Sequence, residues 1–135
     1  MPSGSCFCGK IHISYSGQPA LTATCHCLDC RKISGTMFST NILVPEDDFQ
    51  IVEGVPKTIT KVADSGKTIT SYFCSECGTT LFRGTESFPG MKIIKAGVLD
   101  GPVALQEASP AVELFVTRRP DWVVPFTGAG QKEVM

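Results

Sequence analysis

"CFCG" at residues 6–9, "CHCLDC" at residues 25–30 and "CSEC" at residues 74–77 contain all seven cysteines of this 135-residue chain. A disulfide framework fits this clustering poorly, because alternate residues of an extended segment point to opposite faces. It would also leave one thiol over. Clustered cysteines in a reducing compartment are typical of metal ligands or catalytic groups. The cysteines therefore predict metal sites.

The rest of the composition is that of an ordinary globular protein. Hydrophobic residues make up 42% and charged residues 19%, with a net charge of −1. Basic and acidic residues are mixed along the chain, so the sequence indicates no basic surface for binding nucleic acid or anionic lipid. Residues 1–10 lack the apolar run of a signal peptide, and stretches such as residues 91–98 are too short or interrupted to span a bilayer. We expect a cytoplasmic protein with one domain over residues 1–127, a flexible tail over residues 128–135, and no nucleic-acid or membrane partner.

Alternating and β-rich segments, separated by turn residues, predict a mainly β fold of antiparallel strands. Ile11, Ile13 and Tyr15 share one face of an alternating segment, and Asp64-Ser65-Gly66 is a hairpin signal between two β-rich runs. The expected strands cover residues 10–15, 21–25, 37–44, 58–62, 68–73, 80–83, 92–98 and 112–116. No window favours a helix longer than about two turns. The three cysteine clusters fall at the turns and strand ends, so we expect a single zinc-binding domain in which zinc ions hold the turns together.

Four of the cysteines can form a closed zinc site. Cys74 and Cys77 are a Cys-x-x-Cys pair followed by Gly78, a spacing that lets two sulfurs converge on one ion. Cys6 and Cys8 can supply the other pair if a turn bends the chain between them. Four thiolates leave no room for a substrate, so we interpret this site as structural. A redox role for Cys74 and Cys77 is disfavoured, because no βαβ pattern surrounds them.

The three remaining cysteines explain the odd total. Cys25, Cys27 and Cys30 can surround one ion from a single loop and leave its fourth position open, as in catalytic zinc sites. A site rich in thiolates favours another soft ligand, and a thiol that binds there loses its proton. The sequence therefore predicts two zinc ions per chain, the second of which would present an activated sulfur nucleophile.

Ionisable residues near the second site are candidates for supporting roles. His26 lies between two ligands, so we expect its side chain to face away from the metal as a packing or supporting residue; coordination by His26 is the alternative. His26 and Asp29 are candidate proton carriers. Arg31 and Lys32 follow the loop directly and could offset the charge of the thiolates and bind the substrate, or could be a solvated pair.

At these motifs the sequence resembles the family of glutathione-dependent formaldehyde-activating enzymes, which also includes the centromere protein V group. The resemblance rests on residues 4–9, 25–32 and 73–78, and continues weakly through residues 110–111 and 118–122. It implies a zinc-binding β fold with a structural and a catalytic zinc. The ligands that it implies are Cys6, Cys8, Cys74 and Cys77 for the structural ion and Cys25, Cys27 and Cys30 for the catalytic ion.

The resemblance also implies a carbon–sulfur lyase in which glutathione and formaldehyde combine into S-hydroxymethylglutathione. We therefore expect a zinc-dependent lyase acting on an aldehyde adduct of glutathione, as co-substrate, or of a similar small thiol. No Ser/His/Asp set or phosphate-binding glycine loop argues for a different catalyst. The alternative is a non-catalytic zinc module with an interaction or scaffold role. An open second zinc would favour the enzyme, and a buried or four-coordinate one the module.

Overall fold

Two β-sheets make up most of the protein in this computed structural model, which describes residues 1–135. The smaller sheet has the order β1-β2-β5, and the larger has the order β11-β10-β3-β4-β9-β8-β7-β6. Neighbouring strands are antiparallel, except that β10 pairs in parallel with β3 and with β11. The strands are β1 (Ser3–Ser5), β2 (His12–Tyr15), β3 (Leu21–Cys25), β4 (Ser39–Pro45), β5 (Phe49–Glu53), β6 (Lys57–Val62), β7 (Thr68–Phe73), β8 (Thr80–Thr85), β9 (Met91–Lys95), β10 (Val112–Leu114) and β11 (Gly130–Gln131). The prediction of a mainly β fold is confirmed.

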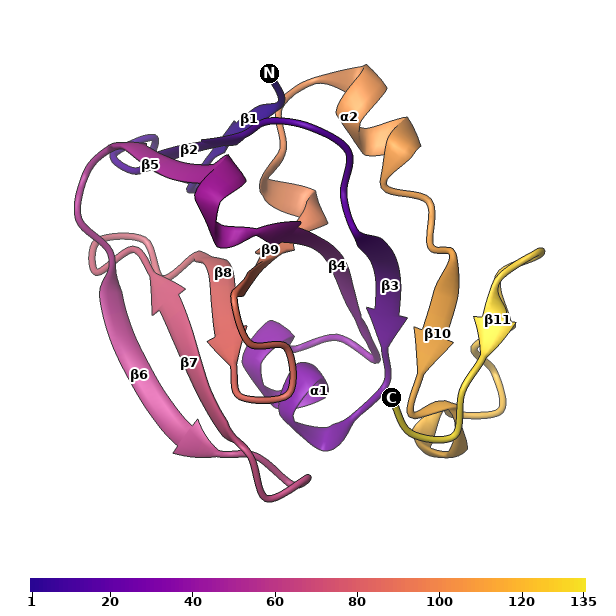
Figure 1. Ribbon diagram of the computed structural model, residues 1–135. Coiled ribbons are helices and arrows are strands. Elements are labelled where there is room, and N and C mark those ends of the chain that lie inside the picture. The colour runs from indigo at the N-terminus through magenta and orange to yellow at the C-terminus, as the bar shows by residue number, and fades with distance from the viewer.

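Two short α-helices and three 3-10 turns connect the strands. They are α1 (Leu28–Ser34), α2 (Pro102–Glu107), η1 (Glu46–Asp48), η2 (Ala96–Val98) and η3 (Val116–Arg118). The large sheet is strongly curved, and α1 lies between its β7–β8 part and its β3–β10 part (Figure 1). The sulfur of Cys27 caps α1 by accepting the N–H of Cys30 at 3.3 Å, and Gly35 ends the helix with φ 71°. Neither α-helix is long or apolar enough to cross a bilayer.

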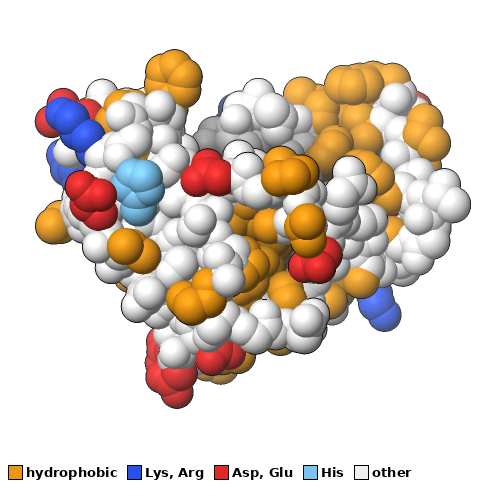
Figure 2. All heavy atoms as spheres, turned by 90° about the horizontal axis from the view of Figure 1, so that it is seen from above, with side chains coloured by type: hydrophobic (Ala, Val, Ile, Leu, Met, Phe, Trp, Pro, Cys, Tyr) orange, Lys and Arg blue, Asp and Glu red, His pale blue; other side chains and the backbone are white.

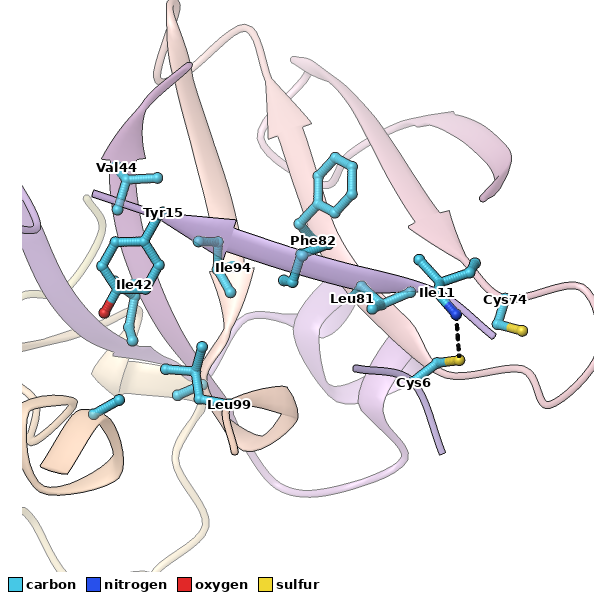
Figure 3. Close-up of a cluster of buried hydrophobic side chains, with 13 residues drawn as sticks. Cys6, Ile11, Tyr15, Ile42, Val44, Cys74, Leu81, Phe82, Ile94 and Leu99 are labelled. Carbon is cyan, nitrogen blue, oxygen red and sulfur yellow. Dashed lines mark hydrogen bonds between the residues drawn. The ribbon is translucent and has the colours of Figure 1, made fainter. Parts of the chain in front are cut away.

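The large sheet uses its two faces differently. Ile42 of β4, Phe82 of β8 and Ile94 of β9 belong to the main hydrophobic core, together with Ile13 and Tyr15 of the small sheet (Figure 3). Successive side chains of a strand alternate between the faces. The residues one position along, among them Leu43, Arg83 and Ile93, therefore point to the other face, and it is this second face that carries the candidate site.

Most expected strands are present with shifted ends, whereas β1, β5, α1 and α2 were not expected. Two further regions differ. The segment expected as a strand over residues 92–98 ends as a strand at Lys95, because η2 follows. The C-terminal segment, expected as a flexible tail, instead adds β11 to the sheet. There the Lys132 N–H donates to the Glu113 carbonyl at 2.9 Å, and the Phe115 N–H to the Val134 carbonyl at 3.2 Å. A strand of two residues is too short to give a periodic signal in the sequence.

Candidate metal centres and the adjoining cavity

The four-cysteine cluster brings together the start and the middle of the chain. All four sulfurs of Cys6, Cys8, Cys74 and Cys77 lie within 4.8 Å of one another. The sulfur of Cys8 lies 3.6 Å from that of Cys6 and 3.7 Å from that of Cys74. A tetrahedral zinc with bonds of about 2.3 Å places its sulfurs about 3.8 Å apart. The cluster therefore has the donor set and the spacing of a closed zinc site.

Two similar turns build this cluster. Gly9 follows Cys8 with φ 80°, and Gly78 follows Cys77 with φ 79°, a backbone region that glycine adopts without steric cost. The Gly9 N–H donates to the Cys6 carbonyl at 3.0 Å, and the Gly78 N–H donates to the Cys74 carbonyl at 2.8 Å. Each turn thus closes around its pair of cysteines, so that one ion can join the two turns.

The surroundings of the four-cysteine cluster are those of a structural element. Cys6 and Cys74 are buried members of the main core, and the Ile11 N–H donates to the Cys6 sulfur at 3.3 Å (Figure 3). The Thr79 hydroxyl lies 3.2 Å from the Cys77 sulfur and is the main reason why the pKa of Cys77 falls to about 5. Both contacts stabilise thiolates, which are the form that binds a metal.

The three-cysteine cluster lies where β3 passes into α1. Cys25 ends β3, Cys27 caps the helix and Cys30 lies in its first turn; their sulfurs are also within 4.8 Å of one another. Hydrogen bonds from Cys25 and Cys27 hold the pKa of Cys30 far below that of a free thiol, and hydrogen bonding to Cys27 and Cys30 correspondingly raises the pKa of Cys25. A metal ion bound to the three sulfurs would displace their protons.

A cavity adjoins these three cysteines, and none of the other four lines it. All of Cys25, Cys27 and Cys30 line the cavity, whose volume is about 80 Å³. One water needs about 10–15 Å³ by this measure, so the space can hold a small organic group. Of the two ligand sets, it is therefore the set of three whose cysteines themselves line a cavity with space for a fourth, external ligand.

Two cations that sequence analysis did not single out line the same cavity. The buried Arg83 donates from Nε to the Ser71 hydroxyl at 3.0 Å and from Nη1 to the Cys30 sulfur at 3.7 Å. Lys95 donates to Asn41 Oδ1 at 2.7 Å, and the desolvation of its ammonium group lowers its pKa to about 8. Arg83 could have been singled out in the sequence, because it is a charged residue within the predicted strand segment "TLFR" at residues 80–83. Both cations can offset the charge of nearby thiolates.

The cations that the sequence did single out lie elsewhere. Neither Arg31 nor Lys32 is among the residues that line the cavity. Lys32 is exposed, and Arg31 is half-buried, with a buried Nε that has no hydrogen-bond partner. Their role in substrate binding stays a prediction.

Asp29 lines the cavity and fastens the β6–β7 hairpin to α1. Its carboxylate accepts the Lys61 ammonium at 3.1 Å and the Asp64 N–H at 2.9 Å. Burial alone would raise the pKa of Asp29, but these two donors outweigh burial and lower it. An ionised Asp29 that accepts both bonds holds the hairpin tip, residues 63–66, beside the cysteine loop.

His26 belongs to a buried polar network. Its side chain is fully buried, and Nε2 lies 2.8 Å from a carboxylate oxygen of Glu113. The Phe126 N–H and the Gln131 amide each donate to the other oxygen of Glu113 at 2.8 Å. Burial alone would raise the pKa of Glu113, but these hydrogen bonds outweigh burial and hold it at about 2. The network ties the cysteine loop to the C-terminal segment.

His26 is neither part of the sulfur cluster nor part of the cavity lining. Because His26 is buried, the histidine visible at the surface in Figure 2 is His12, which lies 4.0 Å from Glu53. Glu113 and its partners were missed in the sequence, because the contact between His26 and Glu113 spans 87 residues of chain. The role of His26 as a proton carrier stays a prediction.

A structural comparison shows the fold. A crystal structure of a Rhodobacter sphaeroides protein superimposes with a TM-score of 0.60 at 22% sequence identity. The superposition covers 76% of this chain and 94% of that chain. The two proteins therefore share their fold.

Sequence comparisons show the family. Proteins from Aspergillus flavus and Podospora anserina, both named "Putative glutathione-dependent formaldehyde-activating enzyme", are 29% identical over 106 residues and 30% identical over 102 residues. These matches cover 73% and 70% of this chain but 54% and 47% of the relatives, so the chain spans about half the length of these curated relatives. The family model described as glutathione-dependent formaldehyde-activating enzyme matches residues 1–118, which contain both cysteine clusters. The chain belongs to the glutathione-dependent formaldehyde-activating enzyme family.

Proposed function

We propose that this chain is a zinc-dependent carbon–sulfur lyase that forms and cleaves the adduct of an aldehyde, such as formaldehyde, with glutathione or a similar small thiol. The observation that carries the proposal is the cavity beside the three sulfurs of Cys25, Cys27 and Cys30. Membership of the family supports the general reaction, since its name gives both glutathione and formaldehyde. The geometry adds a site where a thiol could be activated.

The three-cysteine cluster suits zinc, because its donors are soft sulfurs and the cavity that they line would leave room for a fourth ligand. When bound, zinc would supply a position at which the substrate thiol is held as the nucleophilic thiolate. The four-cysteine cluster is proposed to hold the second, structural zinc. Its four sulfurs would supply all the ligands of a tetrahedral zinc.

The charges around the cavity fit the proposed reaction. In adduct formation, the thiolate sulfur bonds to the carbonyl carbon, the π electrons of the C=O bond move to oxygen, and that oxygen takes a proton. Arg83, which donates to Cys30, would offset the negative charge of the sulfurs throughout. Cleavage of the adduct runs through the same steps in reverse.

Lys95 is the proposed proton carrier at that oxygen. Lys95 lines the cavity, and its pKa of about 8 allows its amino group both to donate and to accept a proton near neutral pH. Asp29 is less suited, because two donors hold it ionised. His26 is less suited, because it does not line the cavity.

Exchange spectroscopy with ¹³C-formaldehyde tests the function. The zinc-loaded protein should accelerate exchange between free formaldehyde and its thiol adduct, with glutathione or ethanethiol as the thiol. Cys27→Ser should remove the acceleration, and Ser75→Ala, an exposed change in the turn of the other cluster, should keep it. Exchange no faster than without protein for both thiols would overturn the lyase proposal and favour a non-catalytic zinc module.

A further inference from the structure

We propose that the cavity beside Cys25, Cys27 and Cys30 binds an apolar substituent of the substrate thiol, so that this chain prefers compact alkyl or aryl thiols to glutathione. The inference rests on the proposed function for the position of the sulfur. It goes beyond that function by assigning the chemical class of the thiol. A thiol whose sulfur lies next to the three cysteines can direct its substituent into this space.

One wall of the cavity is apolar. Twelve of its twenty lining residues are hydrophobic when the three cysteines are included, and nine without them. Leu43 of β4 and Ile93 of β9 are direct cross-strand partners on the face opposite the main core, and Ile69 of β7 lies farther along the same side of the sheet. Leu43 is buried and Ile93 is half-buried, and both line the cavity. Their side chains therefore offer apolar surface to a ligand in the cavity.

Each charged residue of the cavity already has a hydrogen-bond partner within the protein. The two cations, Arg83 and Lys95, donate to Ser71 and Cys30 and to Asn41, respectively. Of the two acids, Asp29 accepts from Lys61 and from the Asp64 N–H, and Asp64 pairs with Arg118 at 2.6 Å. Glutathione carries two carboxylates and an ammonium group. Its ammonium group would meet no unpaired acid in the cavity, and its carboxylates would have to share Arg83 or Lys95 with their present partners or lose hydration unpaired, which is costly.

Phe115 adds an aromatic side chain to the apolar lining in an unusual conformation. It is the only residue other than glycine with a positive φ, at 56°. A bulky residue adopts this region only where its surroundings fix it, and such positions concentrate at binding sites. Phe115 packs against the cluster of Cys25 and Cys30 and lines the cavity. The strained backbone thus places an aromatic ring next to the metal ligands.

Calorimetry on the full chain loaded with zinc tests the preference. From ethanethiol to butanethiol, the affinity should rise about fourfold per methylene group, as expected for burial of each methylene in an apolar site. Butanethiol should bind at least about tenfold more tightly than 3-mercaptopropionate, a thiol of similar size with a carboxylate, and more tightly than glutathione. Equal or tighter binding of the two charged thiols would overturn the proposal.

A matched pair of variants locates the effect. Ile93→Asn should remove most of the preference for butanethiol over 3-mercaptopropionate, whereas Ile59→Asn, on the exposed face of the edge strand β6, should keep it. Phe88 is a half-buried lining residue outside the strands, and Phe88→Ala should also reduce the preference. This second variant serves as the test if Ile93→Asn does not fold. A preference that survives both lining variants would contradict the proposed site.

A ligand without a thiol separates this inference from the proposed function. Butyl methyl sulfide should shift the amide NMR signals of Leu43 and Ile93 without changing the visible spectrum of the cobalt-substituted protein. If no thiol changes that spectrum but the sulfide still shifts these signals, thiol ligation fails and the apolar cavity stands. If thiols change the spectrum but the sulfide leaves the signals of Leu43 and Ile93 unmoved, the cavity assignment is wrong and thiol ligation stands.

Discussion

The two cysteine clusters have almost the same chemistry but different surroundings. The four-cysteine cluster is built from two glycine-containing turns, and two of its members lie in the main hydrophobic core. The three-cysteine cluster lies at a strand end and a helix start, on the other face of the sheet, beside a cavity lined by Arg83 and Lys95. The number of ligands and the adjoining space, not the ligand type, thus separate the cluster that we propose to be structural from the one that we propose to bind a substrate.

The largest expected effect is from Cys74→Ser. A structural zinc contributes on the order of 10 kcal/mol to folding, which is comparable to the whole stability of a domain of about 5–15 kcal/mol. Circular dichroism should therefore show no cooperative unfolding transition in this variant. Cys27→Ser should remain folded, because the cluster it opens is not part of the main core. The same loss of cooperativity in both variants would break the distinction between the clusters.

Metal content gives the next test. Protein purified without added metal should contain two zinc ions per chain by elemental analysis, and Cys27→Ser should contain one. This expectation follows from the two cysteine clusters, in each of which the sulfurs lie within 4.8 Å of one another. One zinc or none in the wild type, with the thiols of Cys25, Cys27 and Cys30 titrating freely, would show that the second cluster is not a metal site.

Glu113→Gln should weaken the link between the cysteine loop and the C-terminal segment. The pKa of Glu113 is about 2 in the folded protein and about 4.3 in an unfolded chain. The ionised form therefore stabilises the fold above about pH 4.3, and this contribution is lost as the pH falls toward the folded value. Urea unfolding at neutral pH should show a loss of about 3 kcal/mol in the variant.

The pH dependence distinguishes this effect from simple loss of packing. The difference in unfolding free energy between wild type and Glu113→Gln should shrink as the pH is lowered from about 5 toward 3. Glu107→Gln, an exposed change on α2, serves as the control and should alter stability little at any pH. A difference that stays constant with pH would contradict the ionised network of Glu113.

A smaller effect is expected from Asp29→Asn. The variant keeps the shape of the side chain but loses a charge-assisted bond to the Asp64 N–H. Hydrogen exchange of the Asp64 amide should become faster by about tenfold, while the exchange of amides in the core strands stays nearly unchanged. Asp121→Asn, at an exposed position, is the control. Unchanged exchange at Asp64 would show that Asp29 does not fasten the hairpin beside the cavity.

Local pattern was enough to predict most of the strands, though not β1 or β5, and the grouping of the cysteines into four and three, because alternation and ligand spacing are properties of neighbouring residues. Arg83, Lys95 and Glu113 could not be found in this way. Their partners Cys30, Asn41 and His26 lie on other elements, between 53 and 87 residues away. The strand β11 was not predicted for a related reason. Its two residues are held by pairing with β10 and by the hydrogen bond from Gln131 to Glu113.

The central claim is that the Cys25, Cys27 and Cys30 centre accepts a thiol at an open ligand position while the four-cysteine centre is closed. The visible spectrum of the protein with cobalt in both sites tests it most directly, with ethanethiol or ethyl methyl sulfide added at a series of pH values. Ethanethiol should add the sulfur-to-cobalt absorption of one new ligand on one of the two ions, with an affinity that falls as the pH drops and the thiol keeps its proton. Ethyl methyl sulfide should add none. An unchanged spectrum with ethanethiol, or the same change with both compounds, would contradict the account.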